Sequence, residues 1–492
     1  MNETENKAKQ CGCSSDAPAT ACEDSAALDA SCRVPLLALF GGAALWLVLG
    51  LLLGLAAAMS FHQPDLFADC ACLTFGHAQA AANDLLLYGF AIPAALGVGL
   101  WIFARLSQAP LALPLVPVVA AHLWHLGVLL GTVFILLGES SGYAWLEYPR
   151  AAAAPMLAGF VLIAVSAVAT MGLRARRELH PSHWFLFAAL LWFVWAYSSS
   201  NLFLLSGHPP RGVVQAIIGW WFANNLVFVF LGLLGVGIAF YFLPQFTGRP
   251  LANTGYALFA VLTLMFFGAW CGIPQGAPVP AWLPALSAFA AMLSVLPVLA
   301  LAILFVQTAF GGNVKCFGGP LCFIRFGMVS FVISSVLYLG GFCPQGSRVL
   351  EFTWFNFGVT QWQLLGFIGM IAIGAIYEIL PRVMARPLPF PKLAKASFFL
   401  FAFGIVFYVL PLLIGGLLQG RKLADATVPL ADVNTGVLLF FRISSLGQAL
   451  LLLGSLFLLL NLFVMTIQWK LGLVKAFIAA VKAPLTTQEV KS

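Results

Sequence analysis

Apolar runs of about twenty residues follow one another along most of the chain, separated by short polar or proline-containing stretches. Because a helix of about 20 apolar residues crosses the hydrocarbon core of a bilayer, each run predicts a transmembrane helix. The predicted spans are 34–60, 85–106, 111–137, 151–173, 184–205, 216–243, 255–273, 283–310, 323–343, 354–380, 397–419 and 436–466. The pattern therefore predicts an all-α fold, a polytopic membrane bundle of about twelve helices in a lipid bilayer.

The predicted spans form one membrane domain, 34–466, because no loop between them is long enough to fold alone. The head, 1–33, is rich in small and polar residues and is expected to be a flexible cytoplasmic segment, and 467–492 a cytoplasmic tail. The head contains four cysteines, Cys11, Cys13, Cys22 and Cys32. Their spacing matches no closed zinc pattern, so they are either a soft-metal site or reduced thiols on a flexible segment.

Composition excludes an ordinary soluble protein, since 62% of residues are hydrophobic, 8% are charged and the mean hydropathy is +0.98. The net charge of +7 comes from loop residues, which indicates helix orientation rather than nucleic-acid binding. Alternate loops carry nearly all Lys and Arg, and the opposite side holds only Arg150, Arg211, Arg348, Arg421 and Lys422. By the positive-inside rule both termini are cytoplasmic.

Four further cysteines are predicted to lie at the opposite, outer side, where disulfides are possible. Cys70 and Cys72 lie in the first outer loop, and Cys271 and Cys343 lie at the outer ends of their helices. The sequence does not decide how they pair.

The span 216–243 contains a polar step, Asn224 and Asn225, within an otherwise apolar run. Side-chain amides in a bilayer are tolerated where they face a bundle interior or a cavity. This helix is therefore expected to turn one face toward protein.

Four stretches together resemble subunit I of the heme-copper oxidases, specifically the C-type or cbb3-type cytochrome c oxidases and the related nitric oxide reductases. They are GYAWLEYPR (142–150), RARRELHPSHWF (174–185), WWFANNLV followed by YFLPQFTGRP (220–250), and LLGFIGMIAIGAIYEILPR (364–382). The resemblance implies a twelve-helix bundle in a bacterial-type cytoplasmic (inner) membrane. It also implies heme b and copper, a role in electron transfer during aerobic respiration, and partner subunits such as a membrane-anchored c-type cytochrome.

Members of that family hold their hemes and copper with six histidines, and the resemblance places each of those positions on this chain. The copper-ligand positions fall at Asn224, Pro274 and Gln275, and the heme-ligand positions fall at Ala82, Val359 and Gln361. The family's active-site tyrosine falls at Gly268. None of the six ligand positions holds histidine, and amides are weak ligands for heme iron or copper. The sequence thus indicates a degenerate site, to which no catalytic residue is assigned.

Other histidines offer an alternative. His122 and His125 are three residues apart in a span and share a helical face, and His77 lies near the start of another span. Three hypotheses follow. The chain is a ligand-depleted, non-catalytic paralogue acting as a membrane subunit or assembly partner, or an active terminal oxidase or nitric oxide reductase with unusual heme ligands such as these histidines. The third is a transporter or channel that uses the vacated cavity.

Overall fold

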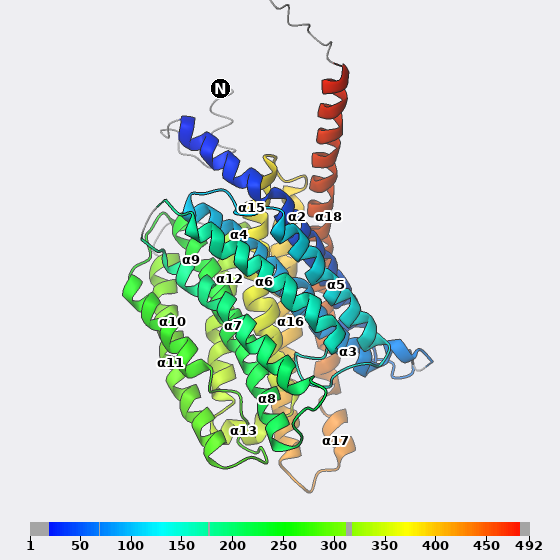
Figure 1. Cartoon of the computed structure of the whole chain (residues 1–492). Coiled ribbons are helices and arrows are strands. Elements are labelled where there is room, and N and C mark those ends of the chain that lie inside the picture. Colours follow the sequence, from blue (N-terminus) through cyan, green and yellow to red (C-terminus); the bar gives the residue numbers. More distant parts are fainter. Residues whose placement is uncertain (1–18, 68, 176–177, 311–316, 483–492) are drawn as a thin grey trace, which may run out of the picture.

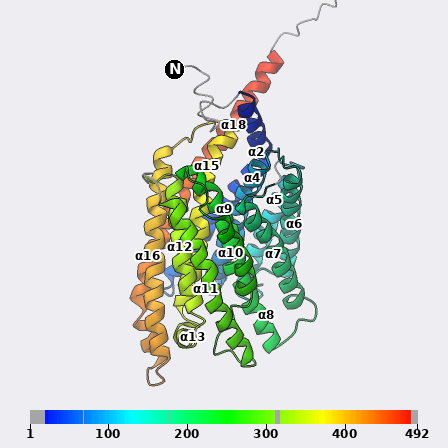
Figure 2. The ribbon, with the colours of Figure 1, turned by 90° about the vertical axis from the view of Figure 1, so that its left-hand side faces the viewer.

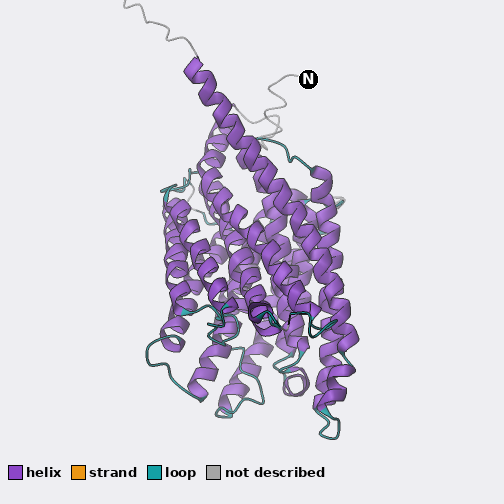
Figure 3. Cartoon of the chain, turned by 90° about the vertical axis from the view of Figure 1, so that its right-hand side faces the viewer, coloured by secondary structure: helices purple, strands orange, loops and turns teal. Residues whose placement is uncertain are grey.

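The computed structural model describes residues 19–67, 69–175, 178–310 and 317–482, and every regular element in this part is helical (Figure 3). Eleven of the described helices are long and apolar enough to cross a membrane. A shorter apolar helix, α10, lies where the seventh span was predicted. The all-α, polytopic fold predicted by the sequence is confirmed.

The described chain passes through its helices in the following order. They are α2 (Ala19–Met59), η1 (Ala71–Leu73), α3 (Phe75–Asp84), η2 (Leu85–Ala91), α4 (Ile92–Ser107), α5 (Val116–Leu136), α6 (Arg150–Gly172), α7 (Pro181–Leu204), α8 (Val213–Asn224), η3 (Asn225–Phe230), α9 (Leu231–Thr247), α10 (Thr254–Gly268), α11 (Trp282–Ala309), α12 (Pro320–Gly340), α13 (Pro344–Leu350), α14 (Trp354–Gln361), η4 (Trp362–Gly369), α15 (Met370–Met384), α16 (Pro391–Leu423), α17 (Leu430–Thr435) and α18 (Leu438–Lys482).

Three continuous spans form the centre of the bundle, α3–η2–α4, α8–η3–α9 and α14–η4–α15. They are almost completely buried, whereas the other spans expose about half of their residues. The second halves of the three spans, α4, α9 and α15, lie in the upper part of the molecule in Figures 1 and 2 and contact one another, and the remaining helices surround them. Each central span contains a π-helical segment, η2, η3 or η4. Such segments are rare and occur often at functional sites.

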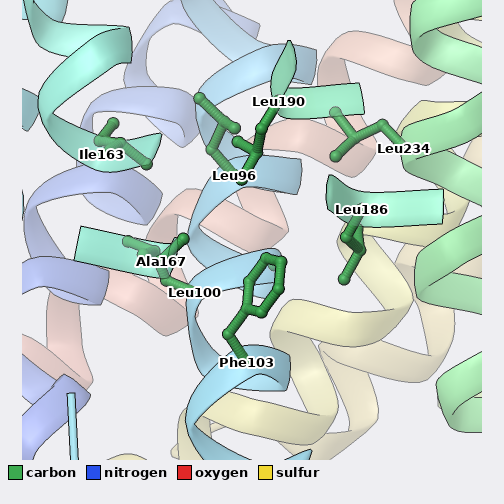
Figure 4. Close-up of a pocket in the computed structure, with 9 residues that line it drawn as sticks. Leu96, Leu100, Phe103, Ile163, Ala167, Leu186, Leu190 and Leu234 are labelled. Carbon is green, nitrogen blue, oxygen red and sulfur yellow. The ribbon is translucent and has the colours of Figure 1, made fainter. Parts of the chain in front are cut away.

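The interior next to these spans is tightly packed. Between α4, α6, α7 and α9 there remains a cavity of only about 10 Å³, lined by apolar side chains such as Leu96, Ile163 and Leu234 (Figure 4). A cavity of this size is at the lower limit for one water molecule, and its walls offer water no hydrogen bond.

The first helix begins earlier than the sequence suggested. The head 1–33 was predicted to be flexible, but α2 is already helical from Ala19. Asp29 fixes this extension because its Oδ1 accepts a hydrogen bond from Trp101 Nε1 at 2.8 Å, and its Oδ2 lies 3.6 Å from Arg105 Nη1. Cys32 is buried in the same interface, and Cys11 and Cys13 lie outside the described residues.

The last helix continues beyond the predicted domain end. Residues 467–482, predicted to be tail, extend α18 as helix. The start of α2 and the end of α18 lie at the same end of the molecule (Figure 1). This agrees with the even number of spans that the charge pattern requires.

The seventh span is shorter than predicted. Asn253 Oδ1 caps α10 by accepting a hydrogen bond from the Gly255 amide at 2.8 Å, and the helix ends at Gly268. The chain then continues without regular structure to Trp282, and Gly272 in this loop has φ +109°. Its backbone approaches Asn224 so closely that a Cβ atom there would lie 2.6 Å from the Asn224 Cβ. Only glycine fits both the dihedral angle and the contact.

Candidate functional site

The three π-helical segments follow the positions at which the resemblance places metal ligands. Asn224 directly precedes η3, Gln361 directly precedes η4, and Ala82 lies three residues before η2. All three side chains are buried. The fold therefore brings these positions to corresponding places on the three central spans.

Asn224 is fully engaged in bonds within the protein. Its Nδ2 donates to the Gly268 carbonyl at 2.8 Å, and the Tyr338 hydroxyl donates to its Oδ1 at 3.1 Å. The neighbouring Asn225 donates to the Ala269 carbonyl at 3.2 Å and accepts from Trp192 Nε1 at 3.1 Å. The expectation that this span turns its amides toward protein agrees with these contacts.

Gln275 and Pro274 lie in the loop after α10. The Gln275 side chain donates from Nε2 to the Pro284 carbonyl at 2.6 Å, and its backbone amide donates to Ser347 Oγ at 3.0 Å. Pro274 is buried and has no side-chain donor atom. The side-chain amide of Gln275 thus connects the loop to the first turn of α11, and its backbone amide connects the loop to α13.

At the heme-ligand positions, Gln361 Nε2 donates to Asn83 Oδ1 at 3.0 Å, which connects α14 to α3. Gln361 Oε1 is buried without a hydrogen-bond partner among the described residues. Ala82 packs on Gly54 of α2, since a Cβ atom added to Gly54 would lie 3.7 Å from the Ala82 Cβ. Val359 is buried and has no lone pair to offer a metal.

Aromatic rings fill the space beside the central spans. Tyr88 of η2 packs against Tyr148 and Tyr197 with ring centroids 5.5 and 6.1 Å away. Near the other two π-helical segments, Phe228 stacks on Tyr338 at 5.3 Å and Phe367 packs on Phe331 at 4.7 Å. The central spans also meet directly.

One such contact is at Gly235, where an added Cβ atom would lie 2.4 Å from the Phe367 ring. Another is at Gly369, where an added Cβ atom would lie 3.4 Å from the Phe90 ring.

The residues at the six positions where the resemblance places ligands do not fit heme or copper. The side chains there are hydrocarbon, proline or amides that already bond within the protein, and the rings described above pack into the space between the helices.

The three candidate histidines are not placed together. His125 Nδ1 accepts a hydrogen bond from Trp46 Nε1 at 3.1 Å, and its ring lies beneath Gly42 of α2. His122 is exposed and its Nδ1 lies 2.7 Å from the Val118 carbonyl. His77 lies near Gly138, beyond the end of α5, which is about 20 Å along the helix axis from His125.

Within the described part of the chain, no group of three or more His, Cys, Asp or Glu residues is arranged to hold a metal ion. Cys70 and Cys72 are free, with 3.1 Å between their sulfur atoms, and Cys271 and Cys343 are also free in this structure.

Beside Asn224 the structure has a cavity of about 300 Å³, and its lining includes two acidic residues, Glu147 and Glu351, that the sequence reasoning did not include. We name it the polar cavity, and its polar lining residues, apart from tryptophan, are Asn83, Glu147, Asn224, Tyr338, Glu351, Asn356 and Thr360. Burial raises the pKa of Glu147 to about 7. The Glu147 carboxyl interacts with that of Asp84, which is wholly buried. An acidic residue at the start of a predicted span, as Asp84 is, could have signalled this site.

These features define a helical membrane bundle with three buried central spans and no metal-binding arrangement at their π-helical segments in the described residues. Comparison with known proteins gives the family. The family model "Cytochrome C and Quinol oxidase polypeptide I" matches residues 34–450, and the chain belongs to this family.

Among its relatives is the cbb3-type cytochrome c oxidase subunit CcoN1 of Stutzerimonas stutzeri, 24% identical over 396 residues, which are 76% of this chain and 81% of the relative. The cytochrome c oxidase subunit 1 homolog of Azorhizobium caulinodans is 22% identical over 446 residues, 86% of this chain and 80% of the relative. A solved heme-copper terminal oxidase dimer has the same fold, with a TM-score of 0.71 and 14% identity, covering 88% of this chain and 84% of that one. The resemblance to subunit I of the heme-copper oxidases is confirmed.

Proposed function

We propose that this chain is a non-catalytic member of the heme-copper oxidase subunit I family that serves as a membrane subunit or assembly partner in a respiratory complex. The observation that carries the proposal is the chemistry at the six positions where the resemblance places ligands. Three of them, Ala82, Val359 and Pro274, have no donor atom in their side chains. The other three are amides, and amides compete poorly with imidazole for iron or copper.

The contacts of those amides also support the proposal. Asn224 bonds to Gly268 and Tyr338, and Gln361 bonds to Asn83, so each would have to give up a buried hydrogen bond to turn toward a metal. Leaving such a partner unpaired in a buried site costs about 1–3 kcal/mol. A bundle held by these bonds keeps its shape without a prosthetic group.

A determination of heme and copper on the protein purified from its own membranes tests the first part of the proposal. A pyridine hemochrome spectrum and an elemental analysis are expected to give far less than one heme b and one copper per chain. A catalytic cbb3-type subunit I, purified in parallel, is the positive control. Stoichiometric heme b in this protein would overturn the proposal.

The second part concerns partners. Mild solubilisation of membranes that carry an affinity-tagged chain is expected to recover other respiratory subunits, among them a c-type cytochrome visible by heme staining of a denaturing gel. A tagged unrelated membrane protein of similar size is the control. Recovery of the chain alone under conditions that keep a known respiratory complex intact would contradict a role as a subunit.

The competing proposal is an enzyme with unusual heme ligands, and it can be tested on the same preparation. His125 has one buried ring nitrogen, Nε2, without a hydrogen-bond partner among the described residues, which is the observation in its favour. If a heme spectrum is present, the His125→Ala variant should lose it and the His208→Ala variant, changed outside the bundle core, should keep it. A spectrum that survives His125→Ala, His122→Ala and His77→Ala would exclude this alternative.

A further inference from the structure

An open apolar groove runs along the surface of the bundle between α2 and α18, the first and the last membrane helices, which contact each other (Figure 1). Its volume is about 810 Å³, and of the described residues that line it only Thr466 has a polar side chain. The lining residues of α18 extend from Leu453 to Thr466, about 20 Å along the helix axis. One leaflet contributes about 15 Å to the hydrocarbon core of a bilayer, so the groove is long enough to hold a lipid acyl chain.

On α2, the floor of the groove contains a glycine that helix packing does not require. Leu37, Gly41 and Leu45 are spaced four residues apart, so they lie on one face of α2. A Cβ atom added to Gly41 would have no neighbour within 4 Å, whereas one added to Gly42 would lie 2.2 Å from His125 Nε2. Gly42 thus allows α5 to approach α2, and Gly41 keeps the groove open.

Basic residues lie one helical turn beyond the groove on both helices. Arg33 precedes the lining residue Leu37 by four positions. Lys470 follows the lining residue Thr466 by four positions, so each basic residue continues the helical face that lines the groove. Between Asp29 and the end of α2, and throughout α18, the sequence contains no acidic residue. The groove therefore ends in positive charge, at the end of the molecule where α2 begins and α18 ends (Figure 1).

Arg33 is held at this end of the groove and retains unused donors. Its Nε donates to the Val383 carbonyl at 2.7 Å, and its guanidinium carbon lies 6.0 Å from the centre of the Trp469 ring. Its two terminal nitrogens donate no hydrogen bond to the described residues. Arg386 adds a further cation, since its Nη1 donates to the Gln468 carbonyl of α18 at 2.8 Å. Guanidinium groups bind phosphate with paired N–H donors, and tryptophan is enriched where membrane meets water.

An apolar groove that ends in cations matches an anionic phospholipid. Such a lipid carries its negative charge at one end of a long apolar chain, and basic residues next to a membrane helix attract it. An apolar helix of a partner subunit would cover the groove but would leave the cations without a counter-charge.

We propose that the groove between α2 and α18 binds one anionic phospholipid, with an acyl chain along Gly41 and Leu456 and its phosphate on Arg33 and Lys470. The lipid belongs to the leaflet on the side where α2 begins and α18 ends. It covers side chains that the protein leaves exposed, such as Phe463, and it connects the first membrane helix to the last. This binding is independent of whether the chain carries heme.

Native mass spectrometry of the full-length protein, delipidated in a mild detergent, tests the proposal. Dioleoyl-phosphatidylglycerol is the anionic probe, and dioleoyl-phosphatidylcholine, which has the same acyl chains but no net charge, is the control lipid. One phosphatidylglycerol per chain is expected to bind, with an affinity at least about tenfold above that of phosphatidylcholine, because two cations face its head group. Equal affinities for the two lipids, or no saturable binding of phosphatidylglycerol, would overturn the proposal.

A photo-reactive side chain distinguishes a lipid from a protein in the groove. Leu456 lines the groove and is exposed. With benzoylphenylalanine in place of Leu456, irradiation of native membranes is expected to attach a phospholipid, detected as an increase in the mass of the chain. Attachment of a second polypeptide instead of lipid would show that a partner helix occupies the groove, and would refute the proposal.

Variants locate the site. Lys470→Gln is expected to weaken phosphatidylglycerol binding by about fivefold and to leave phosphatidylcholine binding unchanged. Gly41→Leu fills the floor of the groove and is expected to weaken the binding of both lipids. Lys475→Gln is the matched control, since Lys475 is also exposed on α18 but lies about 140° around the helix from Lys470. Unchanged phosphatidylglycerol affinity in both Lys470→Gln and Gly41→Leu would place the lipid elsewhere and contradict the proposal.

Discussion

At the scale of single residues, buried amides act as connections between helices. Asn224 joins α8 to the end of α10 and to α12, and Gln361 joins α14 to α3. Within a membrane domain such bonds have few competitors, because the surrounding groups are apolar. The positions at which relatives would need imidazole thus serve here as points of attachment.

Replacing Asn224 tests this function. Asn224→Ala leaves the Gly268 carbonyl and the Tyr338 hydroxyl without their partner, so the free energy of unfolding should fall by about 1–3 kcal/mol. Thermal unfolding of the purified protein in detergent measures the change. Asn434→Ala, at an exposed position of α17, is the control and should leave the midpoint unchanged. Equal midpoints for the two variants would contradict the assigned role.

Glu147 makes stability depend on pH. Burial raises its pKa from the usual 4.5 to about 7, and Asp84, Tyr88 and Tyr148 are the titratable groups around it. An acid that binds its proton more tightly in the folded state stabilises that state at low pH, and this stability is lost as pH rises from 4.5 through 7. The melting midpoint should therefore decrease over this interval. In Glu147→Gln, which stays neutral, the decrease should be much smaller, and an identical pH profile would contradict the assignment.

At the scale of elements, glycines set the distance between neighbouring helices. α16 and α18 form an extensive contact, and Gly447 of α18 lies directly on α16, where a Cβ would be 2.2 Å from the Tyr408 amide nitrogen. No side chain of α16 can move to make room, because the obstructing atom belongs to the backbone. The close approach of these two helices therefore depends on the absence of a side chain.

Gly447→Ala is expected to force α18 away from α16 and to lower the free energy of unfolding by about 1–3 kcal/mol. Gly41→Ala is the matched control, since Gly41 also lies within a helix but a Cβ there would have no neighbour within 4 Å. Differential scanning fluorimetry of both variants measures the difference. A drop for Gly41→Ala as large as that for Gly447→Ala would show that the contact is not the cause.

The hydrophobic pattern predicted the helices well, because each membrane span must form its backbone hydrogen bonds within the helix and present an apolar surface. It was less accurate at the ends. Residues 19–33 look polar and flexible but are helical, because Asp29 finds Trp101 and Arg105, which are distant in sequence. The loop after α10 reads as apolar span, yet Gly272 and its contact with Asn224 turn the chain out of the helix.

The site was predictable in part. The positions Asn224 and Gln361 could be identified from motifs, but their partners could not, since hydrogen bonds to Tyr338 or Asn83 depend on how distant spans pack. The sequence suggested a vacated cavity, but its acidic lining was missed because Glu147 and Glu351 are more than 200 residues apart in sequence and each looks like an ordinary loop residue. His122 and His125 share a helix, yet one is exposed while the other packs on α2.

At the scale of the whole molecule, the charge pattern determines the expected orientation in the membrane. Both described ends of the chain lie on one side, and the loop that contains the exposed Cys72 is assigned to the opposite side. A membrane-impermeant maleimide should therefore label the protein in intact spheroplasts, and labelling should fall sharply in the Cys70→Ser/Cys72→Ser double variant. A green fluorescent protein fused after Ser492 should be fluorescent. Labelling that occurs only after membrane permeabilisation would show that the orientation is the opposite of the expected one.

The π-helical segments η2, η3 and η4 have a consequence for anyone who maps the central spans one position at a time. A π-helical turn contains about one residue more than an α-helical turn. The helix that follows it is therefore rotated about its axis by about 100° relative to a continuous α-helix. Any property that repeats every 3.6 residues, such as the reactivity of introduced thiols, should then break phase within 85–91, 225–230 and 362–369. The same helical face of a span therefore contacts one set of neighbouring helices before the π-helical segment and a different set after it.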